Sequence, residues 1–152
     1  ILESLYLKVL LGFKDIDRSA RGLAKTLKED EEKILKALKS LQQRGLVEEQ
    51  KTSKGTTRWA TDAQYTIFKD DHTNEMLAKF HRQSFLKAIA AQRLPKGTRR
   101  FDALVLPLSP KDYANMAKEF ETFLDHLFYK YNVDELKGKS LYQIQIGTFP
   151  AI

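Results

Sequence analysis

Apolar residues recur at helical spacing in three successive stretches of the first half of the chain. These stretches are residues 1–13, 20–27 and 34–41. Gly12 and Asp15 end the first predicted helix. Asp17 and Asp30 stand just ahead of the second and third, where a carboxylate accepts hydrogen bonds from the free amides of a first turn. Gly45 ends the third, because glycine takes the left-handed capping conformation at little cost.

Two short stretches after Gly45 have the composition of β-strands. Residues 46–50 form the first predicted strand, residues 58–61 form the second, and the polar residues 51–57 between them are typical of a turn. Three helices followed by a hairpin is the element order of a winged helix-turn-helix. We therefore predict a winged-helix domain over residues 1–62.

The second half of the sequence predicts the order helix, strand, helix, strand. Asn74 begins a helix that runs to about Leu94, with an inner face formed by Met76, Leu77, Phe80, Ser84, Phe85, Ala88 and Ile89. Residues 103–108 form a predicted strand that lies at a sheet edge or ends at Pro107, which has no amide hydrogen. Ser109 and Pro110 begin a long helix with an apolar stripe from Tyr113 to Tyr131. Residues 141–148 alternate apolar and polar side chains, as a strand does.

The predicted fold class is therefore α+β: a winged helix-turn-helix followed by a helix-strand-helix-strand C-terminal unit. Residues 63–73 form a connector and residues 74–152 form the C-terminal unit, with a predicted role in dimerisation or sensing. Two strands alone make a marginal sheet. They would gain stability by packing on the winged helix or by pairing with a second chain, so we expect a homodimer.

Composition narrows the classes of protein further. The 152 residues include no cysteine, which excludes disulfides and fits a reducing cytoplasm, where we expect the protein to act. No apolar run reaches the length of a membrane span. The net charge of +6 favours an anionic partner, and seven basic residues with no acidic one lie between Met76 and Phe101.

Double-stranded DNA is the partner that a winged helix with this charge predicts. In DNA-binding members of the class, the third helix enters the major groove and the hairpin contacts the backbone. The candidate DNA-contacting residues are Lys33, Lys36, Lys39, Gln43 and Arg44 on the third helix, and Lys51, Lys54 and Arg58 on the hairpin. The function this predicts is a transcriptional regulator. The alternative is a non-enzymatic protein-interaction module on the same scaffold, which the acidic cluster at residues 29–32 favours, since it would repel phosphate.

The remaining chemistry-bearing residues define one weaker candidate site. His81, Arg82, Arg99 and Arg100 form a candidate site for an anion or a partner, against the alternative that Arg100 pairs with an acid such as Asp102. Residues 70–72 read Asp-Asp-His, but no second cluster has metal-ligand spacing, so we expect no metal and no cofactor. The sequence has no phosphate loop, nucleophile elbow or paired carboxylates, and we expect no catalytic residues and no enzyme.

Several short motifs together resemble a bacterial family of regulators. They are Phe80-His81-Arg82-Gln83, Leu94-Pro95, Arg100-Phe101-Asp102, Leu108-Ser109, Tyr142-Gln143 and Phe149-Pro150. The family is domain of unknown function 4423, and the resemblance covers essentially the whole chain. It implies a winged-helix segment followed by this C-terminal unit, in a regulatory protein. Family members also carry a further N-terminal helical region that is absent here, which predicts that the chain is a fragment and leaves DNA contact by that region as an alternative.

Overall fold

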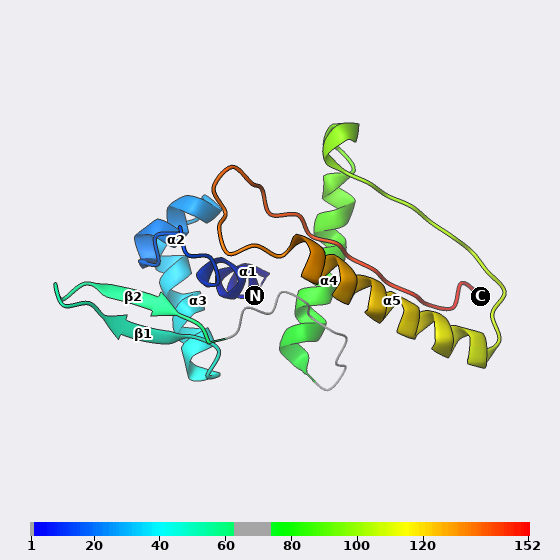
Figure 1. Cartoon of the computed structure of the whole chain (residues 1–152), viewed down its shortest axis with the longest axis horizontal. Coiled ribbons are helices and arrows are strands. Elements are labelled where there is room, and N and C mark those ends of the chain that lie inside the picture. The colour runs from blue at the N-terminus through cyan, green and yellow to red at the C-terminus, as the bar shows by residue number, and fades with distance from the viewer. Residues whose placement is uncertain (1, 63–73) are drawn as a thin grey trace. The chain divides into compact units, whose positions relative to one another are not determined.

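The computed structural model describes residues 2–62 and 74–152 (Figure 1), and the contacts within the chain divide it into two units. Ile1–His81 together with Val133–Leu141 form the first unit, and Arg82–Asn132 together with Tyr142–Ile152 form the second. The predicted connector over residues 63–73, and with it the Asp-Asp-His sequence at 70–72, lies outside the described residues. The predicted domain boundaries therefore stay a prediction.

The first unit begins with three helices and an antiparallel hairpin. The helices are α1 (Leu2–Leu11), α2 (Ala20–Leu27) and α3 (Glu31–Gln43), and the strands are β1 (Glu48–Lys51) and β2 (Thr57–Ala60). The strands pair in the register Glu49↔Trp59 and Gln50↔Arg58. This element order resembles a winged helix-turn-helix, as the sequence predicts, and the fold class is α+β.

Local capping chemistry sets the ends of these helices. Asp30 caps α3 as predicted, since its carboxylate accepts from the amides of Glu32 (2.9 Å) and Lys33 (3.3 Å). The prediction for α2 is wrong by two residues. Ser19 is the cap and accepts from Gly22 N at 3.0 Å, while Asp17 accepts from Ser19 N at 2.9 Å and so holds the cap in place.

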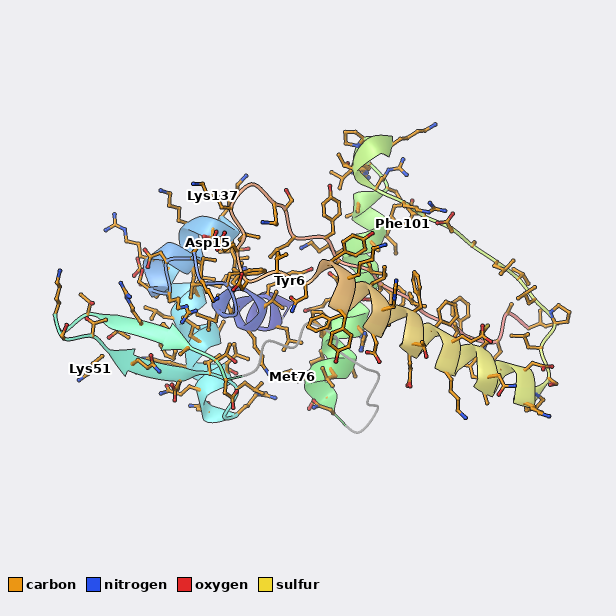
Figure 2. The ribbon with its side chains drawn as sticks, in the orientation of Figure 1. Tyr6, Asp15, Lys51, Met76, Phe101 and Lys137 are labelled. Atoms are coloured by element: carbon orange, nitrogen blue, oxygen red, sulfur yellow. The ribbon has the colours of Figure 1, made fainter. Side chains whose placement is uncertain are left out.

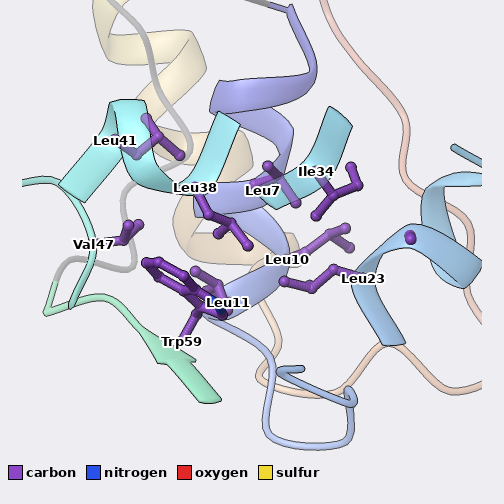
Figure 3. Close-up of a cluster of buried hydrophobic side chains, with 10 residues drawn as sticks. Leu7, Leu10, Leu11, Leu23, Ile34, Leu38, Leu41, Val47 and Trp59 are labelled. Atoms are coloured by element: carbon purple, nitrogen blue, oxygen red, sulfur yellow. The ribbon is translucent and has the colours of Figure 1, made fainter. Parts of the chain in front are cut away.

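One apolar core holds the three helices and the hairpin together (Figure 3). Its buried members come from α1, α2, α3, the turn after α3, and β2: Leu7, Leu10, Leu11, Leu23, Ala24, Ile34, Leu38, Leu41, Val47 and Trp59. Trp59 also donates its backbone N–H to the oxygen of Arg18 (3.0 Å), which ties β2 to the connection between α1 and α2. Burial of α3 on this side determines which of its faces is left exposed.

A segment from the far end of the chain completes the first unit. Asp15, between α1 and α2, accepts hydrogen bonds from the backbone amides of Leu136 (2.8 Å) and Lys137 (2.7 Å). Lys14 forms an ion pair with Asp134 and donates its amide to the oxygen of that residue (2.7 Å). Leu136 packs against the core. The sequence assigns Asp15 only to the end of a helix, so this clasp between residues 14–15 and 134–137 is not predicted.

The second unit contains most of α4 (Glu75–Ala91), a short 3-10 helix (Lys96–Thr98) and α5 (Pro110–Tyr131). Asn74 accepts from Met76 N and Leu77 N, and Ser109 accepts from Asp112 N, so both predicted helix starts are confirmed. In Figure 1 the chain after residue 141 runs beside α5. A hydrogen bond of 3.0 Å between Tyr113 Oη and Thr148 Oγ1 fixes this neighbourhood.

The two strands predicted in the C-terminal half are not formed. Residues 101–109 and 140–152 are extended but belong to no sheet, and the hairpin is the only sheet of the described residues. The apolar residues 103–108 and the alternating residues 141–148 have the sequence pattern of strands. A strand also needs a second strand to pair with, and the pattern does not predict one. The apolar faces predicted for the helices are also largely uncovered: Phe85 and Ile89 on α4 are exposed, and α5 has no buried residue.

We expect truncation of Leu38 to destabilise the first unit strongly. Its side chain is fully buried in the core, and Leu→Ala at such a site costs about 2–5 kcal/mol. Urea unfolding followed by the fluorescence of Trp59, the one tryptophan of the chain, measures this directly. Lys39→Ala, on the exposed side of the same helix, is the matched control and should change the free energy of unfolding by less than about 0.5 kcal/mol. Equal effects of the two variants would contradict the assigned core.

Protonation of Asp15 should open the clasp. The backbone N–H of Leu136, followed by that of Lys137, holds the pKa of Asp15 below its ordinary value. The stabilisation is therefore present above about pH 3.9, where an unfolded aspartate is ionised, and is lost as the pH falls through the lower folded-state pKa. In an NMR titration, the amide signals of Leu136 and Lys137 should shift together with a midpoint below about 3.9, and this shift should vanish in Asp15→Asn. A midpoint at or above the ordinary value would contradict the clasp.

Candidate nucleic-acid interface

The exposed side of α3 carries a run of basic and polar residues opposite the core. At about 100° per residue, Ile34 and Leu38 each lie about 160° around the helix from Lys36. Lys39 lies about 60° and Gln43 about 20° from Lys36, so the three share one exposed face. Because the apolar side is buried against α1, α2 and β2, this polar face is directed outward.

The acidic residues at the start of α3 differ in whether their carboxylates have hydrogen-bond or ion-pair partners. The carboxylate of Asp30 accepts hydrogen bonds from backbone amides of the first turn of α3, and Glu29 forms an ion pair of 3.0 Å with Lys33. Glu31 and Glu32 lie exposed in the first turn. Lys33 is therefore a weaker candidate for binding phosphate than Lys36 and Lys39. The basic character of this face belongs to the middle and the C-terminal end of α3, where the cap residue Arg44 is also exposed.

The hairpin separates two of its predicted DNA-contacting residues. Trp59 points into the core, and residues paired across an antiparallel ladder lie on the same face. Arg58 therefore shares the outer face with Gln50, while Lys51 shares the opposite face with Thr57. Since side chains alternate along a strand, Lys51 and Arg58 cannot both face the same DNA backbone.

The tip of the hairpin is a closed turn that presents Lys54. Thr52 donates its amide to Thr56 O (2.8 Å), and Gly55 N–H donates to Thr52 O (2.9 Å). Gly55 takes φ +73°, a conformation that residues with a side chain rarely adopt. Lys54 lies exposed at this tip.

The residues of the second candidate site belong to different units, and each has contacts in its own unit or segment. His81 belongs to the first unit and makes an edge contact with the ring of Phe80, whereas Arg82, Arg99 and Arg100 belong to the second. Arg100 donates to Asp102 at 2.5 and 3.3 Å, which is the alternative that the sequence left open. This ion pair raises the pKa of Arg100 and lowers that of Asp102.

Arg99 is also engaged within its own segment. Its Nε donates to the backbone oxygen of Leu94 at 2.8 Å, and its guanidinium lies 5.7 Å from the ring centroid of Phe101. Arg99 and Arg100 are thus each hydrogen-bonded to groups of their own segment. Arg82, on α4, is exposed.

No group of three or more metal-ligating His, Asp or Glu side chains lies close together in residues 2–62 and 74–152. No helix in the same residues is long and apolar enough to cross a membrane.

The arrangement of α1, α2, α3 and the hairpin resembles a winged helix-turn-helix. The chain belongs to the family described as Domain of unknown function (DUF4423), whose family model matches residues 3–151. No curated protein matches the chain. Among solved structures, a point mutant of Lactococcus lactis ZitR is similar at 16% identity and a TM-score of 0.35. The similarity covers 86% of this chain and 74% of that one.

Proposed function

We propose that this chain is a DNA-binding transcriptional regulator whose winged helix contacts the duplex and whose C-terminal unit serves dimerisation or sensing. The observation that carries the proposal is the exposed face of Lys36, Lys39 and Gln43, which lies opposite the buried side of α3 and next to a projecting hairpin. Lysines attract phosphates regardless of sequence, and a glutamine side chain can read a base edge.

The exposed acids define how such a helix would approach DNA. Recognition helices of this class commonly contact bases through their N-terminal residues. Here Glu31 and Glu32 occupy that end and repel phosphate. The proposed contact therefore runs from Lys36 to Arg44, with Lys54 at the hairpin tip on the backbone.

A protein-interaction module on the same scaffold is the second candidate function. The exposed Glu31 and Glu32 favour it, because they suit a basic protein surface better than a nucleic acid. This candidate predicts no measurable affinity for duplex DNA at physiological ionic strength. Such a result would contradict the DNA-binding proposal.

Charge reversal on α3 tests the proposed interface. We expect Lys36→Glu/Lys39→Glu to lower the affinity for a random 30-base-pair duplex at least tenfold, and to reduce the slope of log affinity against log salt by about two, one counterion release per phosphate contact. Fluorescence anisotropy at several salt concentrations measures both quantities. Lys111→Glu/Lys118→Glu, exposed on α5, makes the same change in net charge and should retain most of the affinity. Equal losses in the two double variants would show that only net charge matters.

The hairpin allows a second test that depends on its faces. Lys51 and Arg58 point to opposite sides, so replacing them singly with alanine should have unequal effects on DNA affinity. The residue that faces the duplex should account for one phosphate contact and a salt slope lower by about 0.9, and the other should change neither quantity. Losses of the same size from both variants would contradict the contact geometry derived from the ladder.

A further inference from the structure

The chain exposes far more surface than a compact protein of its mass. Its accessible surface is 11885 Å². A folded monomer of 17.6 kDa exposes about 7,900 Å², so the excess is about 4,000 Å². Two units of one chain commonly bury about 600–1,500 Å² against each other, which is less than this excess.

The excess is concentrated in the second unit. Ser84 is the only buried side chain of Arg82–Asn132 and Tyr142–Ile152, all of which are described residues. By contrast, the apolar core of the molecule lies wholly in the first unit. A unit of this size without a core of its own cannot offset the entropy of ordering its chain.

Residues 99–109, which we name the arm, carry a run of exposed apolar side chains in this unit (Figure 2, where Phe101 is labelled). Leu104 is 79% and Val105 is 81% exposed, and Leu106 and Leu108 are exposed as well. The backbone groups of residues 103–108 make no hydrogen bond to any described residue. An extended apolar segment with unpaired backbone groups can pair with a strand of another chain.

The size and the charges of this surface fit a second copy of the same chain. Obligate homodimers bury about 2,000–5,000 Å² in total, which the excess of two chains readily supplies. The unit also carries both signs of charge: residues 82–101 hold six basic residues and no acid, while α5 holds four acids beside three lysines. Three of these acids, Glu119, Glu121 and Asp125, form no ion pair with a described residue. Two copies of a surface that carries both basic and acidic patches can bind each other around a two-fold axis, because each basic patch meets the acidic patch of the other copy.

We propose that the arm packs against the C-terminal unit of a second copy of this chain, and that the protein is a homodimer in which the arm gains the backbone partners it lacks in one chain. This deepens the proposed function by naming the partner and the segment of the dimerisation unit. It also explains why residues 103–108 have the sequence pattern of a strand although no strand of the described residues pairs with them.

The mass in solution tests the proposal without any DNA, so its outcome is separate from that of the proposed function. Light scattering coupled to gel filtration, at tens of micromolar, should give twice the 17.6 kDa of one chain. Leu104→Lys/Val105→Lys should give the mass of one chain, since charges on the arm prevent its burial. Because both side chains already face solvent in the single chain, the substitution should not unfold it. Unchanged fluorescence of Trp59, buried in the first unit, verifies this.

A matched control and a second measurement make the result specific to the arm. Gln92→Lys/Asn115→Lys adds the same charge at exposed polar positions of the same unit and should leave the dimer intact. Hydrogen exchange should show protected amides at residues 103–108 in the unaltered protein and fast exchange in the arm variant. A single-chain mass for the unaltered protein would overturn the proposal, whether or not another protein covers the arm. A dimer that survives the arm variant with the same protection would overturn the assignment of the arm.

Discussion

Burial of Leu38 and its neighbours on α3 against Trp59 and α1 is the interaction on which the rest of the first unit depends. A helix has one direction for its apolar side, and once that side is packed the direction of every other side chain follows. Lys36, Lys39 and Gln43 are exposed for this reason, and not because they are polar. The same tryptophan determines the faces of the hairpin, since its inward position assigns Arg58 to the outer face and Lys51 to the other. One core therefore positions both elements of the candidate interface.

The acidic start of α3 shows how one set of residues serves stability and constrains binding. Asp30 satisfies helix amides, and Glu29 neutralises Lys33, so neither contributes a free negative charge to the surface. Glu31 and Glu32 favour the helix electrostatically, because the N-terminal end carries a partial positive charge. They do so at the end of the helix that meets the bases in many relatives of this fold class. The negative charges of the first turn of α3 thus stabilise the helix and at the same time oppose the binding of phosphate there.

The sequence predicts the features of this protein that depend on neighbouring residues and misses those that depend on distant ones. Asp30, Asn74 and Ser109 act as caps within three residues of themselves, so their roles can be read from the chain. Ser19 and Asp17 both suit a cap, and only the path of the backbone decides between them. Residues 103–108 have the composition of a strand, but composition does not provide a neighbour. The hydrogen bonds from Leu136 and Lys137 to Asp15 span more than a hundred residues, and no local pattern marks them. The exposed positions of the predicted α3 and hairpin residues agree with a binding surface, but exposure does not identify the molecule that binds.

The clasp at Asp15 also bears on how the chain matures as it is made. The helices and hairpin of residues 2–62 emerge from the ribosome early and contain nearly all of their own core. The backbone donors that Asp15 needs are synthesised only after α5 is finished. The nascent winged helix therefore passes through a stage in which Lys14 and Asp15 are solvated and one edge of its core is open where Leu136 will lie. A shortened protein that stops before residue 133 would remain permanently in that stage, with its hairpin and third helix in place but its last apolar contact missing.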